Sequence, residues 1–142
     1  MPLPLLKEAI EVIGAGLVQQ YGMTETAGTV VALGAEDHDP EGNRRMTSAG
    51  KALPGVEIRI VDDAGEILPA GAIGEILVRS DANMHGYWHL PEATAHTVDS
   101  ENWLRTGDAG YLDDDSYLFI CDRVKDMVCS GGENVYPAEV EA

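Results

Sequence analysis

The sequence predicts an α+β fold that is mostly β, and three observations support this class. Glycine occurs 16 times and proline 7 times, which is typical of a chain with many turns. Residues 56–61 alternate between apolar and polar positions, the period of a half-buried strand, and residues 73–78 form a second strand-like segment. Only residues 6–13 place apolar side chains at the i, i+3, i+4, i+7 spacing of a helix face.

The N-terminal end of the chain predicts a short helix followed by a strand. Pro4 stands where a helix can begin, and Gly14 and Gly16 follow the last apolar position of the predicted helix. Residues 17–20 are then expected to form a short buried strand that leads into a glycine-rich turn. Residues 34–50 are polar and predict a loop.

The part of the chain after residue 61 predicts turns, a short helix and further strands. Residues 62–65 predict a turn after the first alternating strand, and residues 91–96 predict one or two helical turns. Residues 117–120 read as a strand after an acidic turn, and Val128 is expected in a further strand. No internal repeat is visible, so the chain is expected to form one domain of ordinary size with the start of another.

Charge and composition exclude several functional classes. The net charge is −16, and no cluster of lysine and arginine is large enough for nucleic-acid binding. Lys7, Glu8 and Glu11 interrupt the N-terminal apolar stretch, so no signal peptide fits, and no run approaches the ~20 apolar residues of a membrane span. We therefore expect a cytoplasmic protein in which Cys121 and Cys129 are reduced.

The first candidate motif covers residues 21–25, Tyr-Gly-Met-Thr-Glu. A tight turn at Gly22 can offer backbone N–H groups and the Thr24 hydroxyl to an anion. Glu25 would repel that anion unless it holds a cation such as Mg²⁺, and the Tyr21 ring gives a flat face for a base. The alternative is an ordinary strand-to-helix turn with Thr24 as N-cap.

The second motif is Trp-Leu-Arg-Thr-Gly-Asp at residues 103–108. A carboxylate presented after a glycine can accept hydrogen bonds from two neighbouring ribose hydroxyls, and each such bond contributes about 1.5–3 kcal/mol in favourable cases. The alternative is that Asp108 closes an Asx-turn.

The third motif is the charged segment 122–126, followed by a glycine pair. It can be a solvated linker, or a pivot in which Arg123 binds a phosphate or ribose oxygen and Lys125 changes its backbone angles. Gly131 and Gly132 would let the backbone pass close to a ligand.

These motifs, in this order, resemble the adenylate-forming superfamily of acyl-CoA synthetases, luciferases and peptide-synthetase adenylation domains. The resemblance runs from about Gln20 to the last residue and includes further markers at residues 74–76, 86–87 and 91–94. Met23, and the final residues from Gly131 onward, look most like fatty-acyl or aryl-CoA ligases. Such enzymes use ATP, release AMP, require Mg²⁺ and take CoA as a substrate.

The resemblance implies a role for each matching residue. Tyr21 would pack on adenine, Thr24 with Gly22 would contact the adenylate phosphate, and Asp108 would hold the ribose hydroxyls. Glu25 would bind Mg²⁺. On the hinge side, the implied residues are Arg123 for the nucleotide, Lys125 as the hinge, and Gly131, Gly132 and Glu133 along the path of the CoA pantetheine.

The resemblance also implies an architecture. Residues 1–122 would be the C-terminal part of the large AMP-binding domain, including a barrel-like β subdomain, and residues 123–142 the hinge and first strands of a small C-terminal domain. The sequence ends one turn into a helix that Pro137 would begin. We therefore expect a truncated chain that can self-associate through surface exposed by the truncation.

The departures from the family pattern limit the expected activity. The phosphate loop ending Pro-Lys-Gly and the catalytic lysine are not among these 142 residues, so the fragment itself is expected to be inactive. Two alternatives are a non-catalytic nucleotide-binding module and an adenylation domain of another adenylate-forming enzyme. A third is a structural β domain in which every motif is only a turn.

Overall fold

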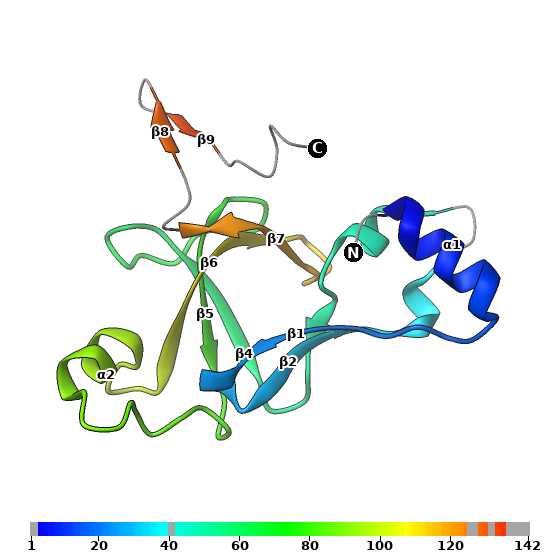
Figure 1. Cartoon of the computed structure of the whole chain (residues 1–142). Helices are drawn as coiled ribbons and strands as arrows, with labels where there is room; N and C mark the ends of the chain where they lie inside the picture. Colours follow the sequence, from blue (N-terminus) through cyan, green and yellow to red (C-terminus); the bar gives the residue numbers. More distant parts are fainter. Residues whose placement is uncertain (1–2, 40–41, 125–127, 131–132, 136–142) are drawn as a thin grey trace.

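The computed structural model describes residues 3–39, 42–124, 128–130 and 133–135. Lys125, Gly131 and Gly132 lie outside the described residues. Within the described ranges, two α-helices and nine strands follow one another, and Figure 1 shows how they are arranged in space. They are α1 (Leu3–Ile13), β1 (Gln19–Met23), β2 (Gly28–Leu33), β3 (Lys51–Ala52), β4 (Glu57–Val61), β5 (Gly74–Arg79), α2 (Pro91–Thr97), β6 (Trp103–Leu112), β7 (Leu118–Arg123), β8 (Val128–Ser130) and β9 (Glu133–Val135).

The strand pairs in the described part of the chain are all antiparallel, and they form three sheets with the orders β1-β2-β3, β4-β5-β6-β7 and β8-β9. The first two sheets meet at an isolated bridge between Gly50 and Leu118. There the Ala49 amide donates to the Leu118 carbonyl at 2.7 Å, and the Leu118 amide donates to the Gly50 carbonyl at 2.8 Å. This bridge ties the sheet that carries β1 to the sheet that carries β6.

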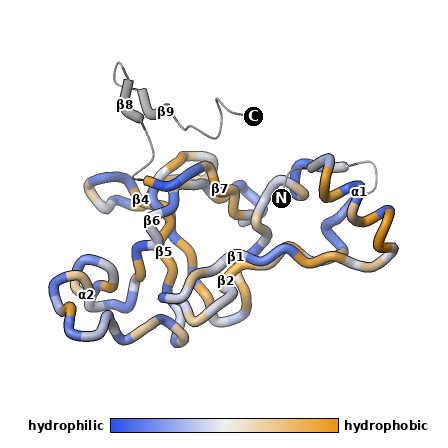
Figure 2. Tube along the Cα trace, in the orientation of Figure 1, coloured by the Kyte–Doolittle hydropathy of each residue, from blue (hydrophilic) through white to orange (hydrophobic). Residues whose placement is uncertain are grey.

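The core lies between these two sheets. Its main cluster consists of six side chains that are at most 3% exposed, and Tyr21 packs against it from β1. The cluster contains Val30, Val31, Ile60, Ile76, Val78 and Leu118. Figure 2 shows the matching hydrophobic stretches along β2 and the central strands. Full burial of such a side chain is worth about 1.5–3 kcal/mol, so this cluster sets how the two sheets dock.

The mostly-β prediction is confirmed, although the described strands form no closed barrel. The predicted strands and helices at 56–61, 73–78 and 91–96 correspond to β4, β5 and α2, and the N-terminal helix to α1. The expected buried strand at 17–20 is wrong. The strand starts at Gln19, none of its residues is fully buried, and Val18, which precedes it, is 55% exposed.

Helix α1 buries little of its apolar surface. Leu6 is fully buried, whereas Leu5, Val12 and Ile13 are 52%, 77% and 60% exposed. Neither α1 nor any other helix in the described ranges has the length and apolar character that crossing a bilayer requires. The division of the chain after residue 122 remains a prediction.

Candidate functional site

The first predicted motif spans the end of β1 and a short 3₁₀ turn, Thr24–Thr26. The Thr26 hydroxyl closes this turn. It accepts from the Met23 amide at 3.1 Å and donates to the Gly28 carbonyl at 2.7 Å. The alternative with Thr24 as N-cap is therefore wrong. Thr24 is exposed, and within the described ranges its hydroxyl has no partner, so it is available to a ligand.

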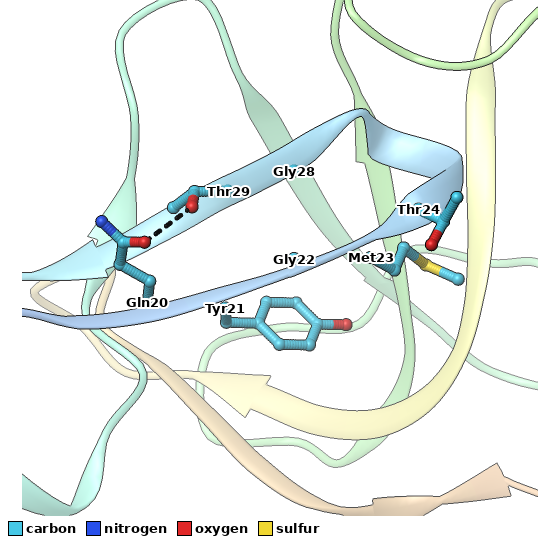
Figure 3. A pocket seen from close by; sticks show the side chains of 7 residues that line it. All are labelled: Gln20, Tyr21, Gly22, Met23, Thr24, Gly28 and Thr29. Atoms are coloured by element: carbon cyan, nitrogen blue, oxygen red, sulfur yellow. Dashed lines mark hydrogen bonds between the residues drawn. The ribbon is translucent and has the colours of Figure 1, made fainter.

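A hollow of about 360 Å³ opens beside this motif (Figure 3). The Gln20–Thr29 hydrogen bond lies at one end of it, and the side chains of Met23 and Thr24 lie at the other. Gly22 sits at a bulge in β1, where a Cβ atom would collide with the Gly28 carbonyl. The absence of a side chain at this position lets the two strands approach closely and keeps the hollow open. Its lining is Gln20, Tyr21, Gly22, Met23, Thr24, Gly28 and Thr29.

Asp108 connects this motif with the second sheet. The Tyr21 hydroxyl on β1 donates to Asp108 Oδ2 on β6 at 2.7 Å. Arg123 is the register partner of Asp108 across β6 and β7, and its Nε lies 3.5 Å from Asp108 Oδ1. The Asx-turn alternative is wrong, because the carboxylate is engaged by these two side chains. The structure thus brings Tyr21, Asp108 and Arg123 together from three strands.

The environment of Tyr21 keeps its hydroxyl protonated. Burial, followed among the raising causes by the hydrogen bond to Asp108, raises the pKa of Tyr21 far above its ordinary value near 10. The Asp108 side chain is only 17% exposed, whereas that of Arg123 is 62% exposed. Tyr21 and Asp108 therefore form a fixed, half-buried pair with a more accessible guanidinium beside it.

Glu25 is held by a loop that precedes α2. The Met84 amide donates to the Glu25 backbone carbonyl at 2.7 Å, and the Tyr87 hydroxyl donates to Glu25 Oε1 at 2.9 Å. The Tyr87 amide in turn donates to Thr94 Oγ1 at 2.9 Å, which anchors the loop to the helix. The hydrogen bond to Glu25 raises the pKa of Tyr87. Sequence reasoning gave Tyr87 no role in the site, because only its place after a glycine stood out.

The residues around Glu25 fit Mg²⁺ only if a bound ligand, such as a nucleotide phosphate, supplies further oxygen atoms. The described ranges contain no group of three or more His, Cys, Asp or Glu side chains that could hold an ion. Mg²⁺ is commonly bound through one or two carboxylates together with substrate phosphates. Tyr87 occupies Oε1, and Oε2 accepts no hydrogen bond from the described part of the chain. Oε2 is thus the oxygen left without a donor from the described residues for a phosphate-bound cation.

Comparison with known proteins shows the family to which the chain belongs. Residues 1–88 match the model of the family described as AMP-binding enzyme. The chain belongs to the AMP-binding enzyme family. It is 47% identical over 137 residues to the fatty acid–[acyl-carrier-protein] ligase ScoC of Streptomyces coeruleorubidus, and 46% identical over 141 residues to a 2-succinylbenzoate–CoA ligase of Geobacillus kaustophilus.

Solved structures of related enzymes share the fold of this chain over nearly its whole length. The O-succinylbenzoate coenzyme A synthetase of Bacillus subtilis in complex with AMP superposes with a TM-score of 0.86 at 43% identity, over 99% of this chain and 28% of that one. The amide bond synthetase McbA of Marinactinospora thermotolerans gives 0.86 at 42% identity, over 95% and 27%. The two curated relatives match 96% and 99% of this chain, which spans about a quarter of their length (26% and 27%).

The hinge side of the predicted site is described only in part. Strand β7 ends at Arg123, and Glu133 begins β9 in the hairpin with β8. Lys125, Gly131 and Gly132 lie outside the described residues, so the hinge and the CoA path remain predictions.

Proposed function

We propose that this chain supplies the nucleotide-contacting part of an ATP-dependent acid–thiol ligase, an AMP-forming acyl-CoA synthetase that acts on a carboxylic acid, most fittingly a fatty acid. The observation that carries the proposal is the contact between Tyr21 and Asp108. It joins two motifs 87 positions apart in a member of the AMP-binding enzyme family. A cytoplasmic location and small-molecule substrates, with no nucleic acid, belong to the same proposal.

The reaction has two half-reactions. The acid's carboxylate oxygen attacks the α-phosphorus of ATP, and pyrophosphate leaves, which gives an acyl-adenylate. The CoA thiol then loses its proton to solvent and its sulfur attacks the acyl carbonyl carbon; the bond from that carbon to the phosphate oxygen breaks, so AMP leaves as the thioester forms. Both steps depend on holding an anionic nucleotide still, so positioning and charge neutralisation are the main physical requirements.

In this proposal, the residues of the three motifs hold different parts of the nucleotide. The Tyr21 ring offers a face to adenine, and Asp108 accepts hydrogen bonds from the ribose hydroxyls. The exposed Thr24 hydroxyl and the backbone N–H groups of its turn donate to the α-phosphate. Arg123 adds positive charge from β7 in a chain whose net charge is −16.

The carboxylate of Glu25 is oriented toward a phosphate-bound cation by Tyr87. When bound, Mg²⁺ would neutralise phosphate charge that this acidic chain cannot neutralise itself. Glu25 would contribute one ligand oxygen, and the nucleotide the others.

The acceptor step involves the residues after β7. In this proposal Lys125 is the pivot about which a small domain turns between the two half-reactions. Gly131, Gly132 and Glu133 line the path of the CoA pantetheine. Acyl carrier protein is a second candidate acceptor, because the ScoC relative at 47% identity is a fatty acid–[acyl-carrier-protein] ligase. Assaying the protein that contains this chain with CoA and with acyl carrier protein separates the two acceptors.

Nucleotide binding tests the proposal directly. Calorimetric titration with AMP should detect binding, and Asp108→Ala should weaken it by at least roughly 10- to 150-fold, since each charge-assisted bond lost is worth about 1.5–3 kcal/mol. Asp63→Ala removes the same charge from an exposed turn and should leave the affinity unchanged. Equal affinities for wild type and Asp108→Ala would favour the structural β domain instead.

Catalysis is tested separately. The 142 residues do not include the family's phosphate loop or catalytic lysine, so alone they should bind AMP and form no acyl-CoA. The protein that contains them should release pyrophosphate with a carboxylic acid from a panel. Binding without pyrophosphate release from any acid in that larger protein would favour the non-catalytic module.

A further inference from the structure

The two oxygens of the Asp108 carboxylate have different partners. Oδ2 accepts the Tyr21 hydroxyl at 2.7 Å, and Oδ1 faces the Arg123 guanidinium at a longer 3.5 Å. A carboxylate can accept about four hydrogen bonds, so both oxygens retain capacity. The short bond to Tyr21 nevertheless restrains the position of Oδ2, whereas the mostly exposed Arg123 can be displaced or shared.

The backbone around Asp108 is fixed as well. Its amide donates to Thr106 Oγ1 at 3.1 Å, and the Thr106 hydroxyl donates to the Ile76 carbonyl at 2.8 Å. Ile76 is a fully buried member of the main core cluster. The main chain of Asp108 is therefore connected to the core through β5.

Tyr21 is connected to the same core from the other sheet. Its ring packs against the main cluster, and its hydroxyl reaches across to β6. The hydroxyl remains a donor at neutral pH, because burial and the neighbouring carboxylate disfavour its ionised form. A hydroxyl that stays protonated on a packed ring can therefore hold its acceptor oxygen in a defined position.

We propose that Tyr21 is a positioning residue for ribose recognition: its hydroxyl holds Asp108 Oδ2 and so aims Oδ1 at the ribose hydroxyls of the nucleotide. This inference rests on the proposed function and adds to the role of the Tyr21 ring, because it assigns the hydroxyl a separate effect. Tyr21 thereby sets selectivity for a ribonucleotide over a nucleotide without sugar hydroxyls.

The test compares two nucleotides on two matched variants. Tyr21→Phe keeps the ring and removes the hydroxyl. Tyr117→Phe makes the same change at a buried tyrosine whose hydroxyl donates to Asp37 at 2.6 Å, away from the nucleotide residues. Calorimetry with AMP and with 2′,3′-dideoxy-AMP then separates contact with the sugar hydroxyls from contact with the base and phosphate.

Tyr21→Phe should weaken AMP binding about tenfold and change dideoxy-AMP binding by less than about twofold. Tyr117→Phe should change neither. Equal losses for both nucleotides would indicate general damage and would overturn the inference, as would unchanged AMP affinity. Wild type that binds no AMP would overturn the proposed function itself, which distinguishes the two failures.

A second measurement applies if Tyr21→Phe does not fold. Site-specific 3-fluorotyrosine at position 21 retains the hydroxyl and gives a ¹⁹F signal. The signal should shift further with AMP than with dideoxy-AMP, because only AMP adds hydrogen bonds to the carboxylate that the hydroxyl holds. Equal shifts would overturn the inference.

Discussion

Gly50 offers the sharpest test of how the two sheets create the site. It lies at the bridge to Leu118, with φ of 106°, and a Cβ atom there would fall far inside contact with the Ala32 carbonyl on β2. Gly50→Ala therefore has two costs. A left-handed backbone costs an L-residue about 1–2 kcal/mol, and a clash with packed backbone costs about 1–3 kcal/mol more.

The expected loss of unfolding free energy is thus about 2–5 kcal/mol, a large share of the ~5–15 kcal/mol of a typical domain. Gly55→Ala is the matched control. Gly55 also has a positive φ, 81°, but a Cβ atom there would meet nothing within 4 Å. It should cost only the conformational term, about 1–2 kcal/mol.

Urea unfolding followed by circular dichroism measures both losses. Gly50→Ala should also weaken AMP binding, because relief of the clash shifts the sheet with Tyr21 away from the sheet with Asp108. Equal costs for the two variants would show that the contact with Ala32 is not structurally important, and the reasoning about the bridge would be refuted.

Three further predictions concern Tyr87, Tyr21 and the exposed apolar residues of α1. Tyr87→Phe should raise the Mg²⁺ concentration needed for half-maximal pyrophosphate release about tenfold, because it frees the Glu25 carboxylate to rotate; an unchanged Mg²⁺ titration would contradict this. Folding raises the pKa of Tyr21, so the contribution of its protonated hydroxyl to the free energy of unfolding is complete below about pH 10 and is lost as the pH rises above that value. Tyr21→Phe should therefore make the free energy of unfolding, measured by urea titration, less dependent on pH above about pH 10. The exposed Val12 and Ile13 on α1 should drive self-association of this chain, which a charged substitution at either position should reduce in sedimentation velocity; a wild-type monomer at all concentrations would argue against it.

Strands with a clear alternation could be predicted from sequence. In strand β4, Ile58 and Ile60 pack in or against the main core cluster and Glu57 beside them is exposed, whereas Val61 is buried in a separate cluster with Leu77 and Trp103. Strand β2 was not predicted, because its run Gly-Thr-Val-Val-Ala-Leu has no period of two, and adjacent Val30 and Val31 are both buried. Strand β6 was not predicted either, because its motif residues suggested a turn.

The site residues were predicted from motifs, but their contacts could not be. Nothing in the spacing of Tyr21 and Asp108 predicts a hydrogen bond, since that contact depends on how two sheets dock. Tyr87 was not predicted as a Glu25 partner for the same reason. Local patterns report which face of an element is apolar, whereas side-chain pairs between sheets depend on the whole core.

The long sequence separation of Tyr21 and Asp108 has a consequence for folding. In a partly folded chain that has formed only one of the two sheets, Tyr21 and Asp108 are not in contact. In our proposal AMP therefore binds the native state alone. Nucleotide at 100 times its Kd would then stabilise that state by about 2.7 kcal/mol. Retention on an AMP column would separate molecules with both sheets docked from kinetically trapped ones.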